Sequence, residues 1–210
     1  MKYKVNDIIE FGNYWQDESI DAGKKPIEWV ILDIKDDRML LLSKYVLDNM
    51  EFDNSVEETT WEKSVLRKWL NNEETLENSF INNAFNETEQ NRIITTDNIS
   101  ERNIPFCTDF NEHTRDKIFI LTIDDLVKRY FHNDNERIVY PTKYVKANNA
   151  VCNISNSFSK TNVGVMWWVR NRGRNKKNVV FVCADGRLSF CGFRCDAYSI
   201  FVRPALWLKY

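Results

Sequence analysis

Basic residues crowd one short segment near the C-terminal end of this sequence. The cluster consists of Arg170, Arg172, Arg174, Lys176 and Lys177. It follows a Trp-rich strand pattern and precedes a run of β-branched residues, so regular structure would hold both of its ends while its own polar side chains stay free. A local group of guanidinium and ammonium side chains favours an anionic partner, although a solvated loop has the same composition.

Cysteine thiols offer a second kind of chemistry. Cys191 and Cys195, with Cys183 nearby, could bind a thiophilic metal or form a redox pair. No Cys-x-x-Cys spacing and no fourth ligand accompany them, and the total of five cysteines is odd. Reduced structural thiols are the favoured interpretation, so we predict neither a disulfide framework nor a metal or cofactor.

Histidine is scarce in this chain. Only His113 and His132 occur, which excludes a three-histidine iron or zinc site of the usual kind, and both lie in or beside predicted loops. None of the six glycines has the spacing that a phosphate-binding loop needs. We therefore predict no catalytic residue, and an enzyme is the less favoured class.

Length and composition limit the class of protein further. A chain of 210 residues, 43% of them hydrophobic, can bury a substantial core, and one domain over residues 1–210 is the economical interpretation. The formal net charge of −2 gives no general reason to expect nucleic acid or an anionic membrane as partner. No apolar run approaches the roughly 20 residues that span a bilayer, and the first residues lack the apolar core of a signal peptide. We expect a cytoplasmic protein without membrane contact.

The elements that must position these residues begin with strands. Three strand-like runs cover residues 5–12, 27–34 and 38–43, and a polar turn joins the last two as a hairpin. A helix is predicted from Thr59, which forms a capping box with Glu62 ahead of an apolar stripe. The stripe consists of Trp61, Val65, Leu66, Trp69 and Leu70. Helical spacing places such a stripe against a sheet, so we expect core packing rather than a ligand site.

The middle of the chain is less regular. Asn86 and Glu89 predict a further capped helical turn. Residues 95–114 are polar and irregular in pattern, which predicts a long surface loop. A short buried strand over residues 117–121 and a helix over residues 122–131 follow.

A hairpin is predicted in the C-terminal third. Residues 179–184 and 187–191 are β-rich runs around Asp185-Gly186, the strongest short hairpin signal. A two-residue turn would place Ala184 opposite Arg187 and fix the pairing of the two strands. The residues that would then share one apolar face are Phe181, Cys183, Leu188 and Phe190.

The order of the C-terminal pieces resembles a widespread bacterial and phage domain family of unknown function. Its members end in a double-Trp strand with Arg, as in residues 166–170, then an Asp-Gly hairpin, then Val-Arg-Pro-Ala-Leu-Trp-Leu, as in residues 202–208. Residues 60–71 are similar to its Trp-Glu-x-Ser-x-Leu-Arg-x-Trp-Leu-Asn signature. Where the family usually has Arg-Ser-Pro-Gly, residues 170–173 read Arg-Asn-Arg-Gly, so extra positive charge replaces a proline turn. Pro204 in the final run suits a strand start or an edge.

The resemblance implies an α+β, C-type lectin-like fold, a twisted antiparallel sheet with flanking helices and long C-terminal loops, shared with formylglycine-generating enzymes and retroelement variable proteins. Calcium-dependent sugar binding is not implied, because the Glu-Pro-Asn and Gln-Pro-Asp motifs are absent. By analogy the binding surface would combine the basic cluster with residues 193–201. That stretch contributes Phe193, Arg194 and Tyr198.

Three hypotheses about function follow from the resemblance and the cluster. We favour a non-enzymatic binding module that recognises a protein or another, anionic, macromolecule through its C-terminal loops. An oxidative enzyme of the formylglycine-generating type, with copper on Cys191 and Cys195, is the alternative. A phage or host-interaction regulatory protein is a third class that the sequence does not separate from the first.

Overall fold

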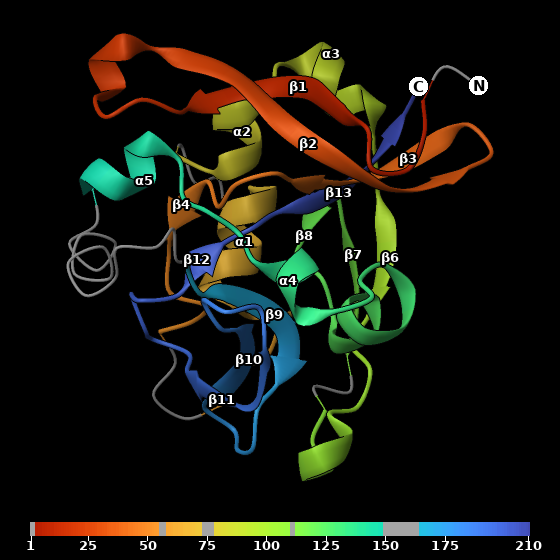
Figure 1. Cartoon of the computed structure of the whole chain (residues 1–210), viewed down its shortest axis with the longest axis vertical. Coiled ribbons are helices and arrows are strands. Elements are labelled where there is room, and N and C mark those ends of the chain that lie inside the picture. The colour runs from red at the N-terminus through yellow and green to blue at the C-terminus, as the bar shows by residue number, and fades with distance from the viewer. Residues whose placement is uncertain (1–2, 55–57, 73–77, 110–111, 149–163) are drawn as a thin grey trace.

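The computed structural model describes residues 3–54, 58–72, 78–109, 112–148 and 164–210 of the chain. It is a mixed α+β structure of mostly antiparallel sheets with a few helices, and the larger sheet curls into a half-barrel (Figure 1). The first and last residues of the described chain lie close together at one end of that sheet. Among the described residues no helix is both long and apolar enough to cross a membrane.

The larger sheet contains the predicted N-terminal strands. Its order is β1-β2-β3-β13-β5, and β8 pairs with β13 as well. The strands are β1 (Ile8–Trp15), β2 (Lys24–Lys35), β3 (Arg38–Ser43), β5 (Ile93–Ile94), β8 (Ile118–Phe119) and β13 (Ala205–Lys209). The predicted hairpin is confirmed: β2 and β3 pair from Lys35 and Arg38 outward, and Asp36 in the turn has a φ of 51°. Asp tolerates this left-handed conformation better than most residues.

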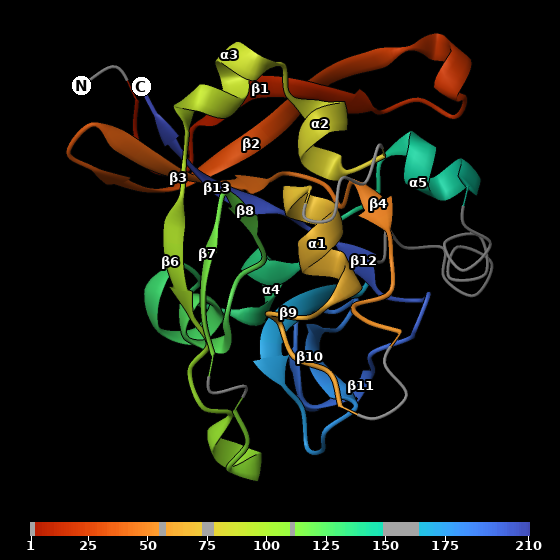
Figure 2. The same ribbon diagram turned by 180° about the vertical axis from the view of Figure 1, so that it is seen from behind.

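A second sheet holds the C-terminal strands. Its order is β11-β10-β9-β12-β4, with β12 parallel to β9 and the other pairs antiparallel. The strands are β4 (Asp48–Asn49), β9 (Trp167–Arg172), β10 (Asn178–Val182), β11 (Leu188–Arg194) and β12 (Phe201–Val202). In Figure 1 this sheet lies below the larger one, and Figure 2 shows the same separation from behind.

The predicted final strand is divided between the two sheets. Phe201–Val202 belongs to the C-terminal sheet, Arg203 and Pro204 cross over, and Ala205–Lys209 enters the middle of the larger sheet between β3 and the pair β5 and β8. Pro204 precedes the strand start, as expected from its missing N–H, and its carbonyl accepts from the Ser43 N–H at 3.0 Å. The strand that follows Pro204 is central rather than an edge.

Short helices cover one face of the larger sheet, where α1 contacts β8 and α2 contacts β1 (Figure 2). They are α1 (Val65–Asn71), α2 (Phe80–Ala84) and α3 (Glu87–Arg92). The predicted capping box of Asn86 and Glu89 is confirmed. The predicted cap at Thr59 is wrong: Ser64 caps α1, its Oγ accepting from Arg67 N at 3.1 Å. Ser64 has extended backbone and follows a turn at Trp61, so the helix begins later.

The segment predicted as a surface loop over residues 95–114 contains a two-stranded ribbon, β6 (Thr96–Ile99) paired with β7 (His113–Asp116). The buried Asp116 carboxylate ties this ribbon to the rest of the molecule. It accepts from Arg67 Nε at 2.6 Å, from Trp61 Nε1 at 3.0 Å and from Asn98 Nδ2 at 2.9 Å. Because such contacts join residues far apart in sequence, a local pattern does not show them.

The remaining elements are short. Thr122 caps the predicted helix, its Oγ1 accepting from Asp125 N at 3.3 Å, and the turns that follow are a π-helix over Asp125–Arg129. The others are η1 (Ile20–Ala22), η2 (Ile104–Phe106), α4 (Asp134–Arg137) and α5 (Lys143–Asn148).

The C-terminal hairpin exists, but its predicted register is wrong. The Cys183 N–H bonds to the Arg187 carbonyl, so three residues, not two, form the turn, and only Gly186 among them has positive φ. Phe181 consequently pairs with Ser189, and Val182 with Leu188, so Phe181 and Leu188 do not share a face. Packing of α4 against the turn explains this register. A Cβ on Gly186 would lie 1.8 Å from the Asp134 carbonyl of α4, so only glycine fits at this position of the turn.

Candidate functional site

The loop between β9 and β10, residues 173–177, is held by its backbone. Gly173 N donates to Asn178 O at 2.6 Å, and Arg174 N donates to Cys191 O on β11 at 2.9 Å. The carbonyls of Lys176 and Lys177 accept from Thr59 N at 3.0 Å and Cys195 N at 2.9 Å. Backbone groups of two other segments, Thr59 and residues 191–195, therefore fix the loop, while the side chains of residues 174–177 are exposed.

Glycine at position 173 is required for this attachment. A Cβ there would lie 2.5 Å from the Cys191 carbonyl, closer than real Cβ contacts allow. Asn103 supports the neighbouring strands, since its Nδ2 donates to the carbonyls of Arg172 at 2.8 Å and Phe190 at 2.7 Å. The close approach of loop and strand brings residues 173–177 beside residues 193–198.

Ion pairs reduce the positive charge of the predicted cluster. Glu58 pairs with Arg172 at 2.6 Å and with Lys176 at 3.2 Å, and the hydrogen bond from Arg172 lowers the pKa of the Glu58 carboxyl. Arg194 pairs with Asp196 at 2.5 Å. Within the described part of the chain, no ion pair is formed by Arg174 or Lys177. Two unneutralised cations thus remain on this surface.

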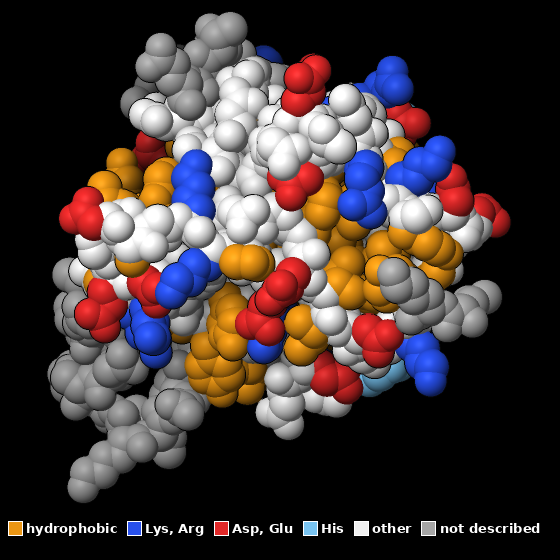
Figure 3. Space-filling view, turned by 90° about the horizontal axis from the view of Figure 1, so that it is seen from above, with side chains coloured by type: hydrophobic (Ala, Val, Ile, Leu, Met, Phe, Trp, Pro, Cys, Tyr) orange, Lys and Arg blue, Asp and Glu red, His pale blue; other side chains and the backbone are white. Residues whose placement is uncertain are grey.

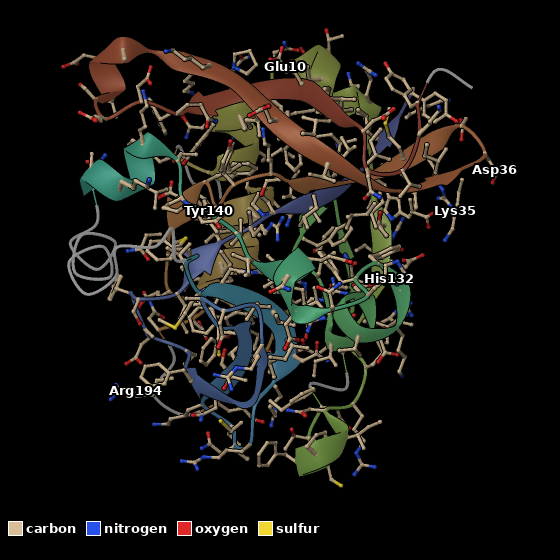
Figure 4. All side chains as sticks on the ribbon, viewed as in Figure 1. Glu10, Lys35, Asp36, His132, Tyr140 and Arg194 are labelled. Atoms are coloured by element: carbon tan, nitrogen blue, oxygen red, sulfur yellow. The ribbon has the colours of Figure 1, made fainter. Side chains whose placement is uncertain are left out.

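Two aromatic side chains are exposed in the segment that bonds to the loop. Phe193 is 50% exposed and Tyr198 62% exposed. The pairing of Asn178 with Arg194 and of Val179 with Phe193 places both β11 residues beside the end of the loop. Figure 4 shows Arg194 at the outer edge of the C-terminal sheet, pointing away from the molecule. We call Arg174, Lys177, Phe193, Arg194 and Tyr198 the C-terminal surface.

Arg170 does not belong to this surface. Its side chain is buried, only 4% exposed, with the guanidinium carbon 5.8 Å from the centre of the Trp61 ring and 5.7 Å from that of Phe119. Residues 167–171 of β9 are all buried, so both faces of this strand are covered. The sequence carried a signal for this burial. Residues 166–169 form an unbroken apolar run, which is typical of a strand covered on both faces, and Arg170 continues that strand.

The cysteines lie in different environments. Cys191 is exposed, Cys183 is half-buried and Cys195 is buried. Burial raises the pKa of the Cys195 thiol to about 11, so the thiolate form that binds metals is disfavoured there. Cys152 lies outside the described residues. In the described ranges no group of three or more His, Cys, Asp and Glu side chains could hold a metal ion, and His113 and His132 are both exposed.

The larger sheet shows no comparable concentration of one charge. In the view from above, over β1 and β2, acidic and basic side chains are interspersed among apolar ones (Figure 3). This agrees with the interspersed charges in the sequence. The C-terminal surface therefore remains the candidate for contact with a partner.

Comparison with known proteins identifies the family. A family model described as a domain of unknown function, DUF6273, matches residues 36–210, from β3 to β13. The chain belongs to this family. The match includes the whole C-terminal surface, whereas β1 and β2 precede it. No curated protein and no solved structure matches the DUF6273 chain.

Proposed function

We propose that this DUF6273 protein is a non-enzymatic binding module that recognises an acidic segment of a partner protein through the C-terminal surface. The observation that carries the proposal is the contrast between the bonded backbone of residues 173–177 and the exposed side chains of Arg174 and Lys177, which form no ion pair in the described structure. Two other segments of the chain bond to the loop's peptide groups, and the exposed side chains of Arg174 and Lys177 extend from it. A surface fixed in this way loses little conformational entropy when it binds.

The side chains suit a protein partner. Phe193, on the strand beside the loop, and Tyr198 offer exposed aromatic area, and aromatic residues and arginine dominate the energetics of protein interfaces. A carboxylate on the partner would form ion pairs with Arg174 and Lys177 and neutralise their positive charges. Rim charges of this kind mainly increase the association rate and make it depend on salt.

The proposal also includes a more specific fold than the mixed α+β class described above. We propose a C-type lectin-like fold, in which C-terminal loops on a fixed scaffold form the binding surface. Support comes from the antiparallel sheets, the short helices beside the larger sheet, and the termini that lie close together. The single domain over residues 1–210, the cytoplasmic location and a phage or host-interaction role stay predictions.

The oxidative enzyme has less support. Copper on Cys191 and Cys195 would need both thiols at one site, but Cys191 is exposed and Cys195 is buried with a raised pKa. Elemental analysis of the purified protein distinguishes the two classes. We expect no stoichiometric copper or zinc; one equivalent of copper, lost in both Cys191→Ser and Cys195→Ser, would favour the enzyme.

The binding proposal is tested with a double variant, Arg174→Ala/Lys177→Ala. Tagged parent and variant are used to capture proteins from a bacterial lysate at low and at physiological salt, and the recovered proteins are compared by mass spectrometry. We expect a specific partner to be recovered by the parent and to be depleted with the variant, more so at low salt, where exposed charges are least screened.

A matched control removes the same charge elsewhere. Lys4 and Lys146 are exposed and lie far from the C-terminal surface in sequence, so Lys4→Ala/Lys146→Ala has the same net charge as the test variant. It should recover the partner like the parent. Equal recovery by all three proteins would leave Arg174 and Lys177 as ordinary solvated side chains.

A further inference from the structure

A cavity of about 470 Å³ lies against the larger sheet, and none of its lining residues belongs to the C-terminal surface. Strands β3, β6, β8 and β13 and the π-helix contribute to its wall. Figure 4 shows Lys35, one of its lining residues, well separated from Arg194. A volume of this size suits a small molecule.

Arg170 lines the cavity and has unused hydrogen-bonding capacity. Its Nη2 donates to the Ile99 carbonyl at 3.3 Å, whereas Nε and Nη1 are buried and bond to no group in the described part of the chain. No carboxylate among the described residues lies within ion-pair distance of the guanidinium. A buried arginine with unpaired N–H donors is rare because an unsatisfied buried charge is costly.

Glu101 offers the complementary group in the same cavity. Its Oε1 accepts from Arg129 Nη2 at 3.3 Å, but its buried Oε2 has no donor among the described residues. The nearby Asp125 differs, since its Oδ2 accepts from Thr122 N and Oγ1, and its Oδ1 accepts from Arg129 Nη1. Unused donors and an unused acceptor thus lie on the wall of one cavity.

The π-helix places Arg129 between these two carboxylates. It runs over Asp125–Arg129 and ends with the Tyr130 N–H bonded to the Asp125 carbonyl at 3.0 Å. π-Helical turns are rare in helices and occur frequently at functional sites. Here the wider turn lets Arg129 neutralise Asp125 through Nη1 while Nη2 holds one oxygen of Glu101, so the second oxygen is left for another donor.

The charges of the cavity balance, and part of its wall is apolar. Its basic and acidic lining residues are Lys35, Arg129 and Arg170, and Asp97, Glu101 and Asp125. Leu40, Phe119 and Trp207 contribute apolar surface. A ligand with net charge would unbalance this wall, so a molecule that is neutral overall, with an anionic group, a cationic group and an apolar part, fits it best.

We propose that the cavity binds a free α-amino acid with an apolar side chain, its carboxylate on Arg170 and its ammonium group on Glu101. The ligand would supply the acceptors that Nε and Nη1 lack and the donor that Oε2 lacks. Its side chain would contact Phe119 and Trp207. This site is independent of the C-terminal surface.

Isothermal titration calorimetry on the full chain tests the proposal. The probes are L-leucine and L-phenylalanine, and two half-ligands, isocaproate without the ammonium group and isoamylamine without the carboxylate. We expect an amino acid to bind and L-leucine to bind at least about tenfold more tightly than either half-ligand, since each half leaves a buried charge unpaired. No binding of either L-leucine or L-phenylalanine, or equal binding of L-leucine and either half-ligand, overturns the proposal.

Variants connect the binding to the two groups. Glu101→Gln keeps the shape of a partly exposed side chain and should weaken amino-acid binding at least about tenfold. Glu87→Gln, at an exposed carboxylate on α3, is the matched control and should bind like the parent. Arg170→Lys, checked for folding by circular dichroism, should also lose binding because it lacks Nε. Unchanged affinity in Glu101→Gln would sink the assignment even if amino acids bind.

Discussion

Arg170 and Arg174 are four positions apart in the chain, yet they lie in opposite kinds of surroundings. Arg170 lies against the rings of Trp61 and Phe119 and bonds to the Ile99 carbonyl, whereas the Arg174 side chain is exposed and only the backbone of that residue is bonded. Charge in the first region is desolvated, so every missing partner costs free energy; charge in the second is screened by water and salt. Residue type therefore says little about role until burial is known.

Deleting the last strand, which lies in the enclosed part of the molecule, should cause the largest loss of stability. Deleting residues 202–210 removes β13 from the middle of the larger sheet, including Leu206, Trp207 and Leu208, which are all buried. Each large apolar side chain contributes roughly 1.5–3 kcal/mol against a net stability of about 5–15 kcal/mol, so we expect no soluble folded protein. Thermal unfolding followed by circular dichroism checks this, and a cooperative transition in the truncated chain would contradict it.

Two tryptophans between residues 60 and 71 differ in burial, so they test the same comparison within one segment. Trp61 is 1% exposed and bonds to Asp116, whereas Trp69 is only half-buried. Trp61→Ala should lower the free energy of unfolding by about 3–5 kcal/mol and Trp69→Ala by roughly 1–2 kcal/mol. Urea denaturation of both variants measures the difference. Equal losses would show that exposure does not decide the contribution of these side chains.

The thiols provide a chemical measure of the same difference. Burial raises the pKa of Cys195 from its ordinary value of 9.0 to about 11, which lowers its thiolate fraction at neutral pH about 100-fold, and the thiolate is the reactive form. Cys191 and Cys107, which are exposed, should therefore be alkylated first, and labelling of Cys195 should accelerate as the pH rises. Peptide mass spectrometry after timed alkylation checks this, with unfolded protein as the control. Equal rates in the folded protein would show that Cys195 is open to solvent.

The smallest effect on stability belongs to the C-terminal surface. Arg174→Ala/Lys177→Ala removes side chains without ion pairs in the described structure and should change the free energy of unfolding by no more than about 0.5 kcal/mol. Urea denaturation checks this, and it also establishes that any loss of partner binding is not a loss of folding. A decrease in the free energy of unfolding of more than about 1 kcal/mol would show that these side chains stabilise the fold.

Local chemistry was sufficient to predict the strands of the N-terminal hairpin and the cap at Asn86. It failed where distant groups compete with a local pattern. Thr59 and Glu62 have the spacing of a capping box, but Ser64 begins the helix after Trp61 turns inward to Asp116. The contact that decides where this helix begins comes from Asp116, a residue far away in sequence.

The C-terminal site shows the same limit. The sequence predicted a basic loop after the double-Trp strand, and its position beside residues 193–201 was expected only by analogy with the family resemblance. The pairing of Arg172 and Lys176 with Glu58 was not predicted, since Glu58 is more than a hundred positions away. The Asp-Gly hairpin was found with a register shifted by one residue, because α4 packs on Gly186. Sequence spacing did not predict that Arg170 would bond to the Ile99 carbonyl or that Glu101 would pair with Arg129.

The crossing of the chain at Arg203 and Pro204 has a consequence for the order of folding. Strand β13 pairs with β3, β5 and β8, all of which leave the ribosome long before it does. Until residues 205–209 arrive, these three strands present unpaired edges, the feature that leads to strand addition between chains. We expect the nascent protein to need protection during synthesis, and refolding to be slow because its closing contacts span most of the sequence. Stopped-flow refolding measures that rate directly; completion of the sheet within the dead time of mixing would show that β13 docks early.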